Sequence, residues 1–71
     1  MSAGTSLALA VVRVLRGAPR PGREQCRRAL DQDRAMLRLP PGDAGNDLIV
    51  AGPYPVTLGE QALDEYVVWE R

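Results

Sequence analysis

Residues 56–71 read VTLGEQALDEYVVWER, and the conformation of this stretch decides which fold the chain is expected to adopt. Thr57 and Glu60 have the Thr-x-x-Glu spacing of a capping box, in which each side chain accepts a hydrogen bond from the other residue's backbone N–H. Apolar and aromatic residues then recur at helical spacing, at Leu58, Ala62, Tyr66 and Trp69. Gly59 and two adjacent valines favour the competing interpretation, a strand over residues 62–69. We expect a C-terminal helix.

The segment before this stretch contains two short apolar runs separated by a turn. Residues 34–39 alternate in character and end at two prolines, which is typical of a strand. Residues 48–52, LIVAG, form a run too short for a helix, because a glycine and Pro53 close it. Between the runs, GDAGND at 42–47 is composed of residues that turns favour. We therefore expect an antiparallel hairpin around residues 34–52.

The N-terminal part predicts one strand and one helix. Residues 6–16, SLALAVVRVLR, are apolar on both faces except for Arg13, which suits a buried central strand. A helix is the alternative, and the three valines favour the strand. After the break GAPRPG, residues 23–32 predict a helix in which Glu24 lies four residues before Arg28, the favourable orientation for an ion pair. We expect this helix to fray at the aspartates that follow.

Together these elements give the order β-α-β-β-α, an α+β fold in a single small domain over residues 1–71, with a flexible lead at residues 1–5. The chain has 71 residues, and so short a chain buries only about 60% of its unfolded surface. Phenylalanine is absent, so the core must be built from Leu, Val, Ile and Ala. We expect a thin core that a partner or a second copy supplements.

The charges are divided unevenly along a chain whose net charge is zero. Residues 1–30 hold six arginines and one acid, whereas residues 31–71 hold three arginines and eight acids. Such an asymmetry can mark a partner-binding face, although pairing within the fold would cancel it. The predicted helix and the loop before it supply a basic face, formed by Arg20, Arg23, Arg27 and Arg28. In the acidic C-terminal segment, Tyr66 and Trp69 are candidate aromatic anchors of an interface.

The residue types that are missing exclude most catalytic chemistry. The chain has no histidine and no lysine, which excludes histidine-based acid–base catalysis, histidine-ligated metals and Schiff bases. One cysteine cannot build a zinc site from several thiolates, and no glycine-rich phosphate loop is present. We therefore expect no enzyme and no cofactor. The lone cysteine, with no signal sequence and no apolar span of ~20 residues, indicates a cytoplasmic protein that does not cross a membrane.

Two further features each have a functional and a structural interpretation. Cys26 lies among arginines that would stabilise a reactive thiolate, but a small buried side chain on the helix is the favoured interpretation. Residues 42–50 match, at several positions, the nonapeptide that binds calcium in β-helices. Calcium takes about six to eight oxygen ligands, whereas this single copy offers only part of a shell, from Asp43, Asn46 and Asp47. We expect a turn there, and no metal.

The sequence therefore predicts a small, non-enzymatic protein-binding or regulatory module. It would act through the charged helix face or through the acidic C-terminal segment, on another protein or on a second copy of itself. The alternative is a DNA-binding regulator of winged-helix type that uses the arginine-rich segment 13–28. The neutral net charge and the absence of aromatic residues among those arginines favour the protein-binding hypothesis.

Overall fold

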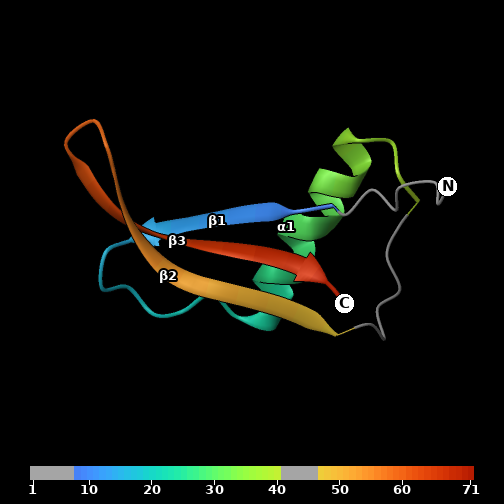
Figure 1. The fold of residues 1–71 in the computed structure, drawn as a ribbon, viewed down its shortest axis with the longest axis horizontal. Helices are drawn as coiled ribbons and strands as arrows, with labels where there is room; N and C mark the ends of the chain where they lie inside the picture. Colours follow the sequence, from blue (N-terminus) through green and yellow to red (C-terminus); the bar gives the residue numbers. More distant parts are fainter. Residues whose placement is uncertain (1–7, 41–46) are drawn as a thin grey trace, which may run out of the picture.

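Three antiparallel strands and one helix make up the described part of the chain, which in this computed structural model is residues 8–40 and 47–71. The elements are β1 (Ala10–Leu15), α1 (Arg23–Met36), β2 (Leu48–Leu58) and β3 (Gln61–Glu70). The strands lie in the order β1-β3-β2, so the last strand is the central one. Helix α1 packs against one face of the sheet (Figure 1). The expected mixture of helix and sheet is confirmed, as an α+β fold with one helix.

The C-terminal helix predicted over residues 57–69 is wrong, because this stretch forms the end of β2 and most of β3. Thr57 lies in β2 and Glu60 in the turn, so no helix begins there for the two side chains to cap. The turn contains Gly59 at φ 62°, a left-handed conformation that favours a two-residue hairpin turn. The β-branched valines that follow suit a pleated strand. The strand alternative is the correct one.

The strand predicted over residues 6–16 is confirmed for residues 10–15, but it lies at an edge of the sheet and not at its centre. One of its two apolar faces packs against α1, and the other belongs to a sheet face that no helix covers in the described residues. The winged-helix order requires a helix in this position, and the fold does not match that order.

Helix α1 begins at Arg23, as predicted, and continues past its two aspartates to Met36. Asp31 is exposed and Asp33 is half-buried. The buried residues on the side of the helix that packs against the sheet are Cys26 and Leu30, so neither aspartate interrupts that apolar side. A hydrogen bond from the Leu37 N–H to the Asp33 carbonyl oxygen, at 3.0 Å, closes the last turn. The expected fraying at the aspartates is therefore wrong.

The strand predicted over residues 34–39, and with it the hairpin around residues 34–52, is also wrong. The first residues of that segment form the last turn of α1, and the chain then changes direction at Arg38, which adopts φ 57°. The apolar run at 48–52 does lie in a strand, β2, but the partner of this strand is β3. Of the turn predicted at 42–47, residues 42–46 lie outside the described residues.

The hydrophobic core lies between α1 and the sheet. Cys26 and Leu30 of the helix are fully buried, and Ala10 on β1 is buried beside them. The buried residues of this cluster are Ala8, Ala10, Val12, Cys26, Leu30, Tyr66 and Val68. With one aromatic ring among these residues, the core is as thin as the composition predicts.

Strand β2 contains a bulge that changes which of its side chains face the helix. β2 has two residues between Ala51 and Tyr54, whereas β3 has one residue between their partners. The bulge contains Gly52 at φ 130° and the cis Gly52–Pro53 peptide bond. Because side chains alternate along a strand, one extra residue reverses the alternation. Tyr54, Val56 and Leu58 therefore face away from α1, as Ala51 does before the bulge.

Candidate interaction surfaces

The sheet face opposite α1 is covered by no element among the described residues, and most of its side chains are apolar. Paired residues of an antiparallel sheet point to the same side, so the register gives the composition of this face. We call it the open face; it consists of Leu9, Val11, Arg13 and Leu15 of β1 and the residue before it, Gln61, Leu63, Glu65, Val67 and Trp69 of β3, and Ile49, Ala51, Tyr54, Val56 and Leu58 of β2.

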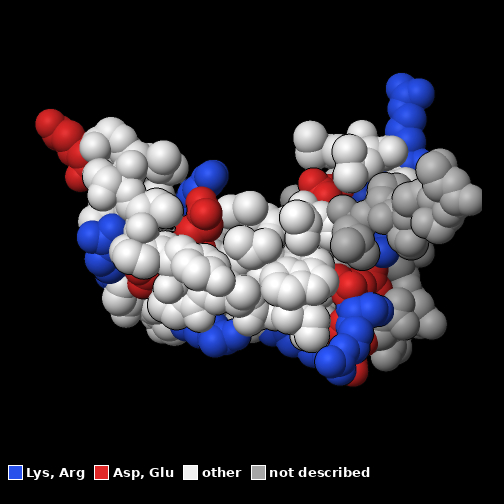
Figure 2. Space-filling model, viewed as in Figure 1, with Lys and Arg blue, Asp and Glu red and all other residues white. Residues whose placement is uncertain are grey.

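Large apolar side chains on the open face are accessible to solvent. The exposed fraction is 47% for Val11, 59% for Leu15 and 50% for both Tyr54 and Leu58. Figure 2 views the molecule from this side and shows a broad uncharged surface over the strands, with most charged side chains toward its margins. A sheet normally buries its apolar face against a second layer, and a large exposed apolar patch marks an interaction site.

One ion pair crosses the middle of the open face. Arg13 and Glu65 are cross-strand partners, and Arg13 Nε lies 3.0 Å from Glu65 Oε2. Tyr54 of β2 is the other cross-strand partner of Glu65. The row Arg13, Glu65 and Tyr54 therefore divides the open face into two apolar parts. Because the two charges cancel, the open face carries no net charge. Such a face suits a partner with an apolar protein surface better than a polyanionic partner.

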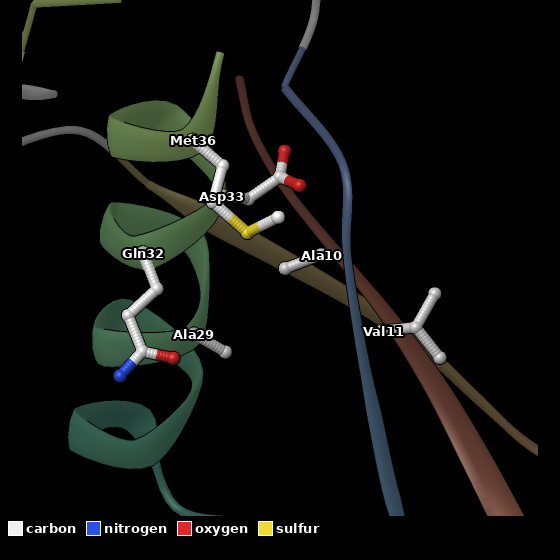
Figure 3. A pocket seen from close by; sticks show the side chains of 6 residues that line it. All are labelled: Ala10, Val11, Ala29, Gln32, Asp33 and Met36. Atoms are coloured by element: carbon white, nitrogen blue, oxygen red, sulfur yellow. The ribbon is translucent and has the colours of Figure 1, made fainter. Parts of the chain in front are cut away.

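A shallow groove runs between the outer edge of β1 and α1. It comprises two adjoining hollows of about 170 and 240 Å³, which share part of their lining. The strand wall is formed by residues 10–12, and the helix wall by Gln25, Arg28, Ala29, Gln32, Asp33 and Met36. Ala10 and Ala29 point toward each other across the groove, whereas the Val11 side chain points away from it (Figure 3). Val11 therefore lines the groove with its main chain.

The arginines predicted as a basic face are directed to different parts of the fold. Arg20 donates a hydrogen bond to the Val50 carbonyl oxygen at 3.0 Å, and its guanidinium lies over the Tyr66 ring, 5.7 Å from the ring centroid. Arg28 forms the predicted pair with Glu24, at 3.3 Å, on the exposed side of α1. Arg20 thus contacts the sheet, whereas Arg28 contacts only its own helix among the interactions described, so the two do not form one basic patch.

Arg27 belongs to an ion cluster that ties α1 to the end of β3. Arg27 Nη1 lies 3.3 Å from the Glu70 carboxylate, and Arg34 Nη2 lies 2.7 Å from the same group. The Glu70 side chain is only 5% exposed, so this cluster is largely shielded from water. Arg23, at the start of α1, also takes part in an interaction within the chain. Of the four predicted arginines, Arg20 and Arg27 hold the helix region to the sheet.

The two predicted aromatic anchors lie on opposite faces of β3. Tyr66 is 3% exposed and belongs to the core beneath α1. Trp69 is half-buried on the open face, where its cross-strand partner is Ile49. Only Trp69 is therefore placed where a partner protein can reach it.

Cys26 is fully buried on the side of α1 that faces the sheet, and its Sγ lies 4.0 Å from the Pro21 carbonyl oxygen. Burial raises the pKa of the Cys26 thiol, and the positive charge of Arg20 opposes this without cancelling it. A protonated, shielded thiol is a poor nucleophile, so the geometry supports the structural interpretation of this residue.

We expect the native protein to react with a soluble disulfide reagent many times more slowly than the unfolded protein. Because the folded state holds the thiol proton more tightly, the stabilising effect is complete below the ordinary thiol pKa and declines as the pH rises above it. The free energy of unfolding measured over this alkaline range should fall less steeply for Cys26→Ala. Equal labelling rates in the native and unfolded states would contradict the assignment.

Among the described residues, no group of three or more acidic or cysteine side chains is arranged to hold a metal ion. Asp47 precedes β2, where its carbonyl oxygen accepts a hydrogen bond from the Arg71 N–H at 3.1 Å. The other two calcium candidates, Asp43 and Asn46, lie outside the described residues. Within the described part, no helix is long and apolar enough to cross a membrane.

Comparison with protein-family models, with curated proteins and with solved structures finds no match for this chain. The surfaces of the molecule itself are therefore the basis for assigning a function.

Apart from Trp69, the residues of the open face were missed as functional candidates by sequence reasoning. A signal for them is present, because residues 66–69 are apolar or aromatic at every position and residues 7–15 are apolar except at Arg13. A strand of this composition at the edge of a small sheet has two apolar sides, and the described residues supply one covering helix. The excess apolar side predicts a surface that another molecule covers.

Proposed function

We propose that this chain is a small, non-enzymatic protein-binding module that acts through the open face. The observation that carries the proposal is that this face presents Leu15, Tyr54 and Leu58 at half exposure or more, without a covering element in the described residues. Among the described residues no element covers this apolar sheet face, and binding another molecule would bury it.

The area of the open face limits the size of the interface that it can form. The ten residues of β3 span about 33 Å, and three strands are about 14 Å wide, so the face covers about 460 Å². The two partners together would bury about 900 Å², which is at the low end for specific protein interfaces. At about 25 cal/mol per Å² of apolar area, much of the gain offsets the cost of association. We therefore expect a transient complex of modest affinity.

The proposal is tested by replacing exposed apolar residues with glutamate. Leu15→Glu or Leu58→Glu introduces a charge on the open face with little loss of core packing, because both side chains are half exposed. The matched control is Leu37→Glu, which changes a residue of similar exposure at the end of α1. Affinity capture from a soluble extract of the source organism should recover a partner with the unchanged chain and with the control, but not with the open-face variants.

Sedimentation and DNA binding complete this test. If the partner is a second copy, the unchanged chain sediments as a concentration-dependent dimer and Leu58→Glu as a monomer. Duplex DNA at low salt, where phosphate contacts are strongest, should not bind. Strong DNA binding that persists in Leu58→Glu, or a captured partner that all variants retain, would contradict the proposal.

A further inference from the structure

The outer edge of β1 presents main-chain groups that have no partner strand among the described residues. The hydrogen bond from the Arg16 N–H to the Ala62 carbonyl oxygen, at 3.2 Å, shows that Arg16 bonds toward β3. Bonding alternates along an antiparallel strand, so every second residue before Arg16 also bonds toward β3. Val11 and Arg13 therefore direct their N–H and C=O groups to the outer edge, and Val11 directs them into the groove.

The outer edge of β2, in contrast, is protected. Pro53 and Pro55 lie within this strand and have no N–H to donate. The carbonyl oxygen of Val50 accepts a hydrogen bond from the Arg20 guanidinium. Folded proteins block exposed sheet edges with such devices to prevent unwanted strand pairing. Strand β1 contains no proline, so the two edges of this sheet differ in their capacity to accept another strand.

The groove has the shape and the lining that an added strand requires. An added strand would lie about 4.8 Å from β1, in the space between β1 and the side chains of α1. Ala10 and Ala29 are small and leave room between them for a side chain (Figure 3). Met36, which is 83% exposed, offers a flexible apolar contact at one end. Hollows of about 170 and 240 Å³ fit side chains of a single extended segment and not a folded domain.

We propose that the groove between β1 and α1 binds an extended peptide segment of a partner protein, which adds to β1 as a fourth strand. The peptide main chain bonds to the outward groups of Val11 and Arg13, and a small apolar side chain enters between Ala10 and Ala29. Arg28, on the helix wall, favours an acidic side chain at that end of the peptide. This mode of binding extends the sheet and leaves the open face uncovered, so it is independent of the function proposed above.

The proposal is tested by selecting binders to the full chain from a displayed library of random ten-residue peptides. We expect selected peptides with few prolines, and new protection from hydrogen exchange at the Val11 and Arg13 amides when a synthetic form of the peptide is bound. Ala29→Arg fills the groove and should weaken the binding more than about tenfold, as measured by fluorescence anisotropy. Val11→Pro removes an outward N–H without removing a bond to β3, and should weaken binding about tenfold.

Two further variants separate this proposal from its alternatives. Val11→Thr keeps the N–H and should restore most of the binding lost in Val11→Pro, while Leu37→Glu lies in neither surface and should bind as the unchanged chain does. Circular dichroism of each variant reports whether it folds. If Val11→Pro does not fold, the effect of Ala29→Arg on peptide binding decides whether the proposal holds. Failure to select any peptide, or binding unaffected by Ala29→Arg, overturns the proposal. A dimer whose exchange protection lies at β1 also overturns it, because a second copy would then occupy the edge.

Discussion

Gly52→Ala is expected to lower the free energy of unfolding by about 3 kcal/mol, the largest effect of any single glycine replacement in the described chain. An added Cβ would lie 2.7 Å from the Glu65 carbonyl oxygen and 3.1 Å from the Tyr66 ring. The first of these neighbours is backbone of the central strand and cannot move without disturbing the sheet. The residue also adopts φ 130°, which side chains of L-amino acids rarely tolerate. Denaturant unfolding followed by tryptophan fluorescence measures the change.

Gly22→Ala is the matched control for this replacement. Gly22 has φ −75° at the start of α1, and an added Cβ would meet no atom within 4 Å. We expect its free energy of unfolding to stay close to that of the unchanged chain. If Gly52→Ala were as stable as Gly22→Ala, the bulge would have to be able to relax, and the close packing of β2 on β3 at this point would be refuted.

Glu70→Ala is expected to cost about 3 kcal/mol of stability, because it leaves two partly buried arginines without their common carboxylate. Arg34 Nη2 lies 2.7 Å and Arg27 Nη1 3.3 Å from the Glu70 carboxylate, and both arginines project from α1 onto the end of β3. Loss of the carboxylate leaves two like charges close together, and Asp31, 3.8 Å from Arg27 Nη1, offsets only part of them. Thermal and denaturant unfolding of the purified variant give the measured change.

The exposed pair of Glu24 and Arg28 provides the control for this prediction. Both side chains are largely in solvent, where an ion pair contributes little to stability. Glu24→Ala should therefore leave the midpoint of unfolding almost unchanged. An equally small effect of Glu70→Ala would show that burial does not strengthen the Glu70 cluster, contrary to the prediction.

The sequence predicted the helix from Arg23, which follows the break at 17–22. The valines favoured a strand over residues 6–16, with a helix left as the alternative, and residues 10–15 form that strand. The stretch from residue 62 to 69 misled because apolar residues fill both faces of β3, and a pattern that is apolar at nearly every position also satisfies helical spacing. Only the pairing with β1 and β2 on both sides selects the strand.

The candidate surfaces were less predictable than the fold, because they depend on contacts distant in sequence. The outward main-chain groups of β1 follow from its register with β3, which no local pattern gives. The reversal of side chains at the β2 bulge, which adds Tyr54 and Leu58 to the open face, likewise depends on pairing. The contacts that tie Arg20 and Arg27 to the sheet were likewise not predictable from local patterns, because the Val50 carbonyl oxygen and the Glu70 carboxylate lie 30 and 43 residues away in the sequence.

The unequal edges of the sheet also limit how far assembly can proceed. A sheet whose two edges both accept strands has a valence of two and can polymerise without end into fibres. Here the prolines of β2 and the hydrogen bond from Arg20 to Val50 block one edge of the sheet. The sheet therefore has a valence of one, and its accepting edge is β1. A strand that adds to β1 therefore terminates growth, so the chain can expose one reactive edge at high concentration without acting as a seed for a filament.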